Sequence, residues 1–278
     1  MSAGTDRARV PDVPDVSDVG EVRDVAGAAV RVSVVMPAYN EAEILERSVG
    51  TVAAALERGA AGGAAVESTG FGVTGFEIIV VENGSSDDTL AIARRLADRD
   101  PRVRVESLPR ADYGAALRHG LLCARGDVVV NFDTDYYDLD FLDAAVGEVL
   151  RPGGPVIVVG SKRGPGSDDR RALPRRLVTA VFATILRSGF GLTVSDTHGM
   201  KALRRAAVID HARACRLGRD LFDTELILRV ERAGLPTAEI AVPVEELRPA
   251  RTSILRRVPR TLVGLVRLRG ALRDRPHA

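Results

Sequence analysis

Residues 32–37 read Val-Ser-Val-Val-Met-Pro, a run of β-branched and apolar side chains that ends at a proline. A run of this kind is typical of a strand buried on both faces. Two similar runs follow, Glu-Ile-Ile-Val-Val at 77–81 and Val-Val-Val-Asn-Phe at 128–132. Apolar residues at helical spacing lie between these runs. The sequence therefore predicts an α/β fold, with a Rossmann-like, mostly parallel sheet flanked by helices.

The spacing also predicts the intervening elements. We expect helices over 87–97 and 113–124, and a strand over 102–107. Asn40, with Glu43 three residues later, resembles a capping box at the start of the first helix.

The chain divides into three parts. Residues 1–29 contain the repeat Pro-Asp-Val-Pro-Asp-Val and predict a disordered tail. Residues 30–255 predict a single α/β domain, with a Gly- and Ala-rich flexible insertion at 58–75. Residues 256–278 predict a basic amphipathic helix.

Composition excludes several classes of protein. The 278 residues carry a formal net charge of +1, and aromatic residues make up only 4%. Nucleic-acid binders need a basic excess and stacking platforms, so we expect no nucleic-acid partner. The two cysteines, Cys123 and Cys215, lie far apart, which excludes a disulfide scaffold or a zinc module with conventional spacing. No apolar run of bilayer length and no secretory signal is evident, so we expect a cytoplasmic protein.

Polar clusters follow the strands at 37–41, 82–87 and 133–135. Ligand sites in parallel α/β sheets lie beyond the carboxyl ends of the strands. Asp133 and Asp135 come directly after an apolar run and lie two positions apart, so in an extended chain both carboxylates point the same way. Their mutual repulsion is relieved by a divalent cation, and carboxylate oxygens suit Mg²⁺ or Mn²⁺. Read alone, the other two clusters are also compatible with ordinary turns and helix caps.

Taken together, these segments resemble the family 2 glycosyltransferases of the GT-A fold. The resemblance rests on Val-Ser-Val-Val-Met-Pro-Ala-Tyr-Asn-Glu at 32–41, Ile-Val-Val-Glu-Asn-Gly-Ser-Ser-Asp at 79–87, Tyr-Gly-Ala-Ala-Leu-Arg-His-Gly at 113–120 and Asp-Val-Val-Val-Asn-Phe-Asp-Thr-Asp at 127–135. It continues through 159–163, 174–177, 195–201 and 222–226 and covers roughly residues 31–255. Within the family, the sequence is most similar to the dolichol-phosphate mannosyltransferase and polyprenyl-phosphate hexosyltransferase branch.

The resemblance implies roles for individual residues. The donor's nucleoside and phosphates would be held by Pro37, Tyr39, Glu41, Glu82, Asn83, Asp133 and Thr134, with the metal on Asp133 and Asp135. The acceptor phosphate would be received by Lys162, Arg175 and Thr179, with Arg176 as a further cation. Asp196 and Asp223 would lie on the acceptor side. We therefore expect inverting transfer of a hexose from a GDP- or UDP-linked donor to a polyprenyl-type phosphate, with Asp135, Lys162, Arg175, Asp196 and Asp223 as the catalytic set.

Two alternatives stay open. A soluble hydroxyl acceptor, on a metabolite or a glycan, would need a carboxylate base, for which Asp223 or Asp196 could serve. A nucleotide-sugar-binding protein without catalysis is suggested by Glu82-Asn83 in place of the family's Asp-Asp pair and by Tyr137 in place of a Gln.

The C-terminal segment bears on the acceptor. Residues 248–278 contain nine arginines and a single acid, Asp274. Drawn as a helix, Leu262, Leu265, Val266 and Leu272 lie on or near one side. Such a helix can lie on an anionic membrane surface, which would make the protein peripheral on the inner face of the cell membrane. Equally, its leucines can dock on the domain.

Overall fold

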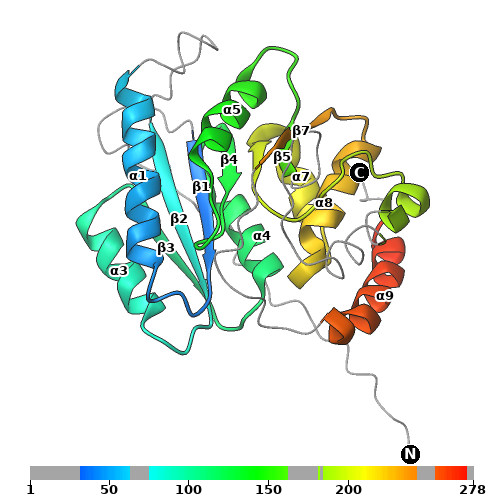
Figure 1. The fold of residues 1–278 in the computed structure, drawn as a ribbon, viewed down its shortest axis with the longest axis horizontal. Coiled ribbons are helices and arrows are strands. Elements are labelled where there is room, and N and C mark those ends of the chain that lie inside the picture. Colours follow the sequence, from blue (N-terminus) through cyan, green and yellow to red (C-terminus); the bar gives the residue numbers. More distant parts are fainter. Residues whose placement is uncertain (1–31, 63–74, 162–180, 182–183, 243–253, 274–278) are drawn as a thin grey trace, which may run out of the picture.

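The computed structural model describes residues 32–62, 75–161, 181, 184–242 and 254–273. Their centre is a seven-stranded sheet in the order β3-β2-β1-β4-β6-β5-β7 (Figure 1). The strands are β1 (Val32–Ala38), β2 (Phe76–Asn83), β3 (Val103–Leu108), β4 (Val128–Asn131), β5 (Ile157–Ser161), β6 (Lys201–Arg204) and β7 (Thr237–Ala241). Only β6 runs antiparallel to its neighbours β4 and β5. The predicted mostly parallel α/β sheet is confirmed.

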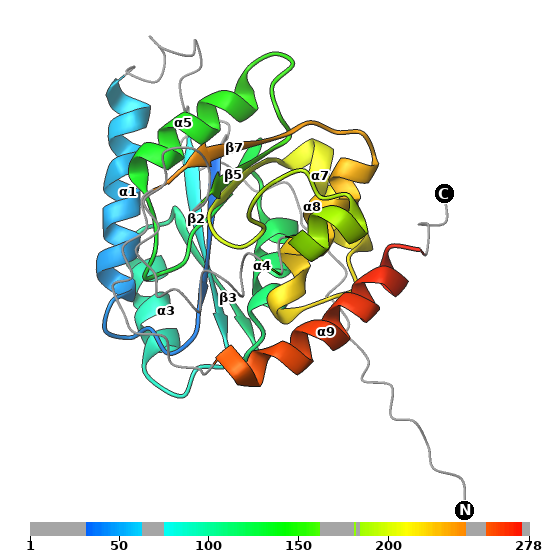
Figure 2. The ribbon, with the colours of Figure 1, turned by 45° about the vertical axis from the view of Figure 1, so that its right-hand side comes forward.

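Helices cover both faces of this sheet. The helices include α1 (Leu45–Gly62), α3 (Thr89–Arg99), α4 (Tyr113–Cys123), α5 (Leu139–Leu150), α7 (Arg205–Ala214), α8 (Phe222–Arg232) and α9 (Ile254–Ala271), with a short 3-10 turn, η2 (Arg219–Leu221), before α8. Residues 184–190 are also helical. Helices α1, α3 and α5 pack on one face, and α4, α7 and α8 on the other, where α9 lies along their outer side (Figure 2).

Alternation along the central strands explains the two layers. Val34 and Met36 of β1 point into the core under α1 and α5, whereas Val35 points into the core under α4. Every residue of β1 is buried. A strand that is apolar on both sides can only lie between two helical layers, as the first sequence run predicts.

The chain order places a switch point beside β1. From β1 the chain passes to β2 and β3 on one side and then returns to β4 on the other. In register, Ala38 lies opposite Glu82 and Val35 lies opposite Asn131. The segments that follow β1, β2 and β4 therefore meet at one edge, where ligands bind in open α/β sheets.

The first helix begins differently from the capping-box prediction. Asn40 has a left-handed backbone with φ of 55°. Its side-chain Oδ1 accepts a hydrogen bond from the Ser86 backbone nitrogen at 2.8 Å. The carbonyl of Glu41 instead accepts from the backbone nitrogens of Ile44 and Leu45. Asn40 thus ties the β1 turn to the β2 turn, and the predicted cap is wrong because a tertiary contact takes its side chain.

The predicted domain boundaries are only partly covered. Helix α1 continues to Gly62, within the range 58–75 expected as an insertion. The tail at 1–29 lies outside the described residues. Helix α9 starts at Ile254, near the start of the predicted C-terminal helix.

Gly120 provides a test of the packing between α4 and the sheet. A Cβ at Gly120 would lie 2.3 Å from Val35 Cγ1, so Gly120→Ala should lower the free energy of unfolding by about 1–3 kcal/mol through overpacking. A Cβ at Gly50, on the exposed side of α1, would meet no atom within 4 Å apart from its chain neighbours and the backbone of its own helix. Gly50→Ala should raise the free energy of unfolding by about 0.5–1 kcal/mol. Chemical denaturation of both variants measures these changes, and equal effects would contradict this packing.

Candidate active site

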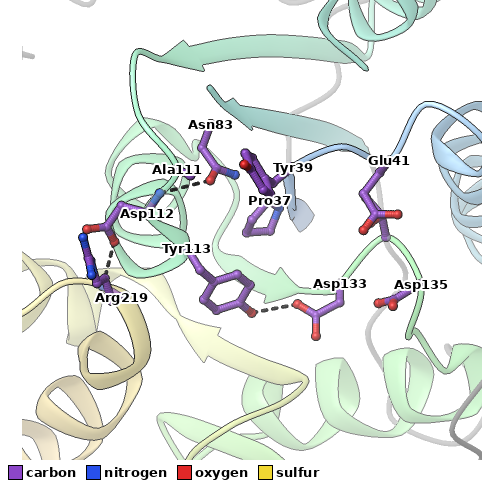
Figure 3. A pocket seen from close by; sticks show the side chains of 11 residues that line it. Pro37, Tyr39, Glu41, Asn83, Ala111, Asp112, Tyr113, Asp133, Asp135 and Arg219 are labelled. Atoms are coloured by element: carbon purple, nitrogen blue, oxygen red, sulfur yellow. Dashed lines mark hydrogen bonds between the residues drawn. The ribbon is translucent and has the colours of Figure 1, made fainter. Parts of the chain in front are cut away.

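A pocket of about 660 Å³ opens where β1, β2 and β4 end. It is lined by Pro37, Tyr39, Glu41, Asn83, Ala111, Asp112, Tyr113, Asp133, Thr134, Asp135 and Arg219 (Figure 3). Seven of these residues, from the three polar clusters, were predicted from the sequence as donor-binding or metal-binding residues. The structure brings them together in one cavity.

Carboxylates gather on one side of the pocket. Asp133 and Asp135 follow β4, and Glu41 follows β1 (Figure 3). The Tyr113 hydroxyl donates a hydrogen bond to Asp133 Oδ1 at 2.8 Å. Burial, and the negative charges of Asp133, Asp223 and Asp135, raise the pKa of the Tyr113 phenol well above its usual value. Tyr113 therefore stays neutral near pH 7 and acts as a fixed donor to Asp133.

The opposite wall is held together by Asn83. Its side-chain nitrogen donates to the Ala38 carbonyl at 2.9 Å, and its oxygen accepts from the Asp112 backbone nitrogen at 3.2 Å. Tyr39, 46% exposed, and Pro37 lie next to Asn83 (Figure 3). Asn83 thus fixes the ends of β1 and β2 to the start of α4, and it leaves an open apolar surface beside Tyr39.

Glu82 lies behind this wall. Its buried carboxylate accepts hydrogen bonds from the Ser85 backbone nitrogen at 2.5 Å and from the Ser107 hydroxyl at 2.8 Å. It is not among the residues that line the pocket. In the structure, Glu82 therefore stabilises the turn at Gly84 and lies outside the lining of the cavity.

Asp112 and Arg219 close the end of the pocket that faces away from the carboxylates (Figure 3). Asp112 caps α4 through the Ala115 backbone nitrogen at 2.9 Å and accepts from the Arg219 backbone nitrogen at 2.6 Å. Arg219 has a left-handed φ of 51°. A Cβ at Gly114 would lie 2.5 Å from the Arg219 carbonyl oxygen, so only glycine permits this approach.

A buried ion pair lies outside the residues that line the pocket. Asp223, in the first turn of α8, lies 3.3 Å from the ammonium of Lys201, measured between Oδ1 and Nζ. At that distance the contact is an ion pair, and Asp223 Oδ1 accepts no hydrogen bond from the described residues. Lys201 donates instead to the Gly199 carbonyl at 2.5 Å.

The other acceptor-side acid, Asp196, is also buried. Asp196 Oδ1 accepts from the His198 backbone nitrogen at 3.0 Å. The Thr197 and Thr224 hydroxyls join this segment to α8 at 2.9 Å. Neither Asp196 nor Asp223 lines the pocket, although the charge of Asp223 acts on Tyr113 within it.

Some site residues lie outside the described part of the chain. These are the predicted acceptor-phosphate residues Lys162, Arg175, Arg176 and Thr179. Conversely, sequence reasoning gave no role to Asp112, Tyr113 or Arg219. Tyr113 opens a motif that carried the family resemblance, and Asp112 has the residue type of a helix cap. No signal marks Arg219, since its place depends on a loop from a distant segment.

The pocket suits a divalent cation. Asp133 and Asp135 offer hard oxygen ligands, and Asp135 is exposed to solvent. Thr134, buried between the two aspartates, accepts the Ser48 hydroxyl on its carbonyl at 2.6 Å. This bond fixes the backbone that carries both carboxylates.

Comparison with known proteins agrees with this geometry. Residues 33–212 match the model of glycosyl transferase family 2. A glycosyltransferase named AglD from Haloferax volcanii is 33% identical over 240 residues, which cover 82% of this chain and 35% of that protein. The match therefore spans about a third of that relative's length. A dolichyl-phosphate beta-glucosyltransferase from Drosophila melanogaster is 30% identical over 79% of this chain and 68% of its own length.

A solved structure shares both fold and sequence. It is a glucosyl-3-phosphoglycerate synthase from Mycobacterium tuberculosis in complex with Mn²⁺, UDP-glucose and phosphoglyceric acid. It is 25% identical, with a TM-score of 0.58 over 88% of this chain and 81% of its own. With the family model matching well over half of the chain, and the sheet and pocket as described, the protein belongs to glycosyl transferase family 2 and is a glycosyltransferase.

Proposed function

We propose that this glycosyltransferase moves a hexose from a nucleotide-sugar to a polyprenyl-type lipid phosphate, with inversion and with a divalent cation. The observation that carries the proposal is the pocket at the switch point, with paired aspartates on one side and the exposed Tyr39 ring beside Asn83 on the other. Curated relatives named as dolichyl-phosphate glucosyltransferases support the lipid acceptor. A solved relative with Mn²⁺ and UDP-glucose supports the cation and the donor.

Different residues of the pocket would contact different parts of the nucleotide-sugar donor. Tyr39 and Pro37 would cover the nucleobase, and Glu41 would contact the nucleoside. Asn83, whose amide is already bonded on both sides, would act by fixing the wall. Asp133 and Asp135 would hold Mg²⁺ or Mn²⁺, which supplies charge neutralisation for the leaving diphosphate. Tyr113 would keep Asp133 oriented toward that cation.

The chemical step is a single displacement. An oxygen of the acceptor phosphate forms a bond to the anomeric carbon as the bond from that carbon to the diphosphate oxygen breaks. The nucleoside diphosphate leaves with the electron pair, and the configuration at the anomeric carbon inverts. Because a phosphate acceptor is already ionised near neutral pH, no strong base is required. Cations must instead place it, a role we assign to Lys162 and Arg175, with Arg219 as the cation on the described wall.

Helix α9 is the proposed contact with the membrane surface. It docks on the domain through Leu265 and Leu268, and the Arg229 side chain donates to the Ala271 carbonyl at 2.8 Å. Its other side exposes Val263 at 53% and Val266 at 74%. These valines, flanked by exposed arginines, suit an anionic interface. Among the described residues, no helix is both long and apolar enough to reach across a bilayer.

A hydroxyl acceptor is the second candidate, and one feature favours it. Asp223 Oδ1 is buried and accepts no hydrogen bond from the described residues. Such an oxygen can accept the proton that an attacking hydroxyl must lose, if the acceptor reaches Asp223 beyond the pocket lining and displaces its contact with Lys201. The same pocket would then serve a metabolite or glycan acceptor.

A donor and acceptor screen tests the proposal. Purified protein with Mn²⁺ or Mg²⁺ should release nucleoside diphosphate from one GDP- or UDP-sugar only when a polyprenyl phosphate is present in detergent or vesicles. Release only with soluble alcohols would establish the second candidate. Tight donor binding without transfer or donor hydrolysis, across the panel, would show a binding protein that has lost catalysis.

Removing the paired carboxylates should abolish metal-dependent donor binding. The double variant Asp133→Asn with Asp135→Asn keeps the size of both side chains but removes both charges. We expect transfer to fall by at least about 10³-fold, because the charge of the leaving diphosphate loses its stabilisation. Calorimetry should detect no Mn²⁺-dependent donor binding. Asp140→Asn, an exposed neighbour outside the pocket lining, is the matched control and should change neither measurement.

The hydrogen bond from Tyr113 to Asp133 should itself contribute to the affinity for the metal. Tyr113→Phe deletes only the hydroxyl that Asp133 accepts, so the affinity for Mn²⁺ in the presence of donor should fall about 10–100-fold. Tyr137→Phe changes a nearby ring that packs against Phe132 at 6.2 Å between centroids, and it should behave like wild type. Equal Mn²⁺ titrations of the two variants would remove Tyr113 from the metal-holding set.

A further inference from the structure

Three potential metal ligands converge at the end of α4 remote from the pocket. They are Glu106 on β3, and His119 and Cys123 one turn apart on α4. Glu106 Oε2 lies 3.1 Å from His119 Nε2, and Cys123 Sγ lies 3.5 Å from the same nitrogen. All three ligand atoms lie within 4.8 Å of one another. None of these residues lines the pocket, so the cluster is distinct from the donor site.

These distances match the edges of a tetrahedral zinc site. With bonds of about 2.0 Å to nitrogen and oxygen and about 2.3 Å to sulfur, neighbouring ligand atoms lie about 3.3 Å (N to O) and about 3.5 Å (N to S) apart. One ring nitrogen faces both the carboxylate oxygen and the sulfur. A single N–H can be aimed well at only one of them, whereas a cation between the three satisfies all.

Surrounding groups orient the carboxylate. Arg104 donates to Glu106 Oε1 at 3.2 Å, which leaves Oε2 turned toward His119. The same guanidinium donates to the Cys123 carbonyl at 3.1 Å and to Glu77 at 2.9 Å. Glu77 offsets the charge of Arg104 next to the cluster. Outer partners of this kind are typical around metal ligands.

We propose that Glu106, His119 and Cys123 form a Zn²⁺ site with three protein ligands and a fourth position open to solvent. The side chains of His119 and Glu106 are 13% and 28% exposed, which allows water to reach that position. A bound ion would join β3, an edge strand, to the C-terminal turn of α4. The oxygen-only donor set of the pocket takes hard cations, and the thiolate and imidazole here select a softer one.

Cobalt substitution tests the site without measuring transfer. Metal-free, full-length protein in a phosphine reductant is titrated with Co²⁺. We expect one equivalent to give the thiolate-to-cobalt charge-transfer band and the strong visible bands of tetrahedral Co²⁺. Zn²⁺ should bleach these bands and raise Tm, whereas Mg²⁺ should do neither. A Co²⁺ titration without thiolate bands would mean a plain hydrogen-bonded cluster and would overturn the proposal.

Variants assign the bands to residues. Cys123→Ala should abolish the charge-transfer band, and Glu106→Gln, which keeps its shape, should weaken Co²⁺ binding at least about tenfold. Cys215→Ala is the matched control, since Cys215 is the chain's other cysteine and its buried thiol donates to the His211 carbonyl. The double variant Asp133→Asn with Asp135→Asn should retain the band, which separates this site from the donor pocket. A band that survives Cys123→Ala, or that disappears in Cys215→Ala, would contradict the assignment.

Discussion

Negative charge concentrated at one edge of the sheet is the constraint on which the site depends. Asp133, Asp135 and Glu41 share the mouth of a single pocket, and Asp223 lies close enough for its charge to raise the pKa of Tyr113. Like charges that share one site are costly unless donors or cations balance them. Within the described structure, Tyr113 supplies a donor to Asp133, and Lys201 pairs with Asp223. The mouth therefore gathers carboxylates from the segments that follow β1 and β4, and the proposed cation would offset part of their charge.

The fold keeps these charges in place through rigid strand ends. β1 is buried along its whole length, pairs with β2 as far as Ala38, and pairs with β4 as far as Val35. Asn83 and Asn40 add side-chain bonds between the turns that follow β1 and β2. Gly114 and Gly120 allow α4 to approach the Arg219 loop and the sheet more closely than any larger residue would. The backbone that carries the carboxylates is therefore held by contacts with the core, including the bond from Ser48 to the Thr134 carbonyl.

The sequence predicts well those features that depend on residues close together in the chain. Runs of β-branched residues gave β1, β2 and β4, and the alternation of Asp133 and Asp135 placed both acids at the same edge. Its error at the first helix concerns a side chain whose partner comes from a distant segment. Asn40 has the residue type of a helix cap, but it bonds to Ser86 instead. The donor contact expected of Glu82 stays a prediction; in the structure its carboxylate accepts hydrogen bonds from Ser85 and Ser107.

Two further features could not be predicted from the sequence, because they also depend on contacts between distant segments. Arg219 reaches the pocket only because Gly114 lets its loop approach α4, and nothing near residue 219 indicates this. Cysteine spacing along the chain argued against a zinc module, since that rule looks for pairs within one segment. Glu106 comes from a strand, and His119 and Cys123 come from a helix that follows it. Ligands drawn from two elements have no fixed spacing, so only the packing of α4 on the sheet brings them together.

The pairing of Asp223 with Lys201 also limits what mutation alone can reveal about the acceptor. If Asp223 is replaced by Asn, the ammonium of Lys201, 1% exposed, loses its counter-charge in the core. Breaking a buried ion pair in this way costs about 3–5 kcal/mol. A loss of turnover in this variant could then result from local unfolding at the start of α8 as readily as from the absence of a catalytic base. The two acceptor chemistries differ instead in the proton: a hydroxyl must give one up, and an ionised phosphate has none to give. Acceptor identity, tested on the intact protein, therefore separates the two mechanisms where substitution of Asp223 does not.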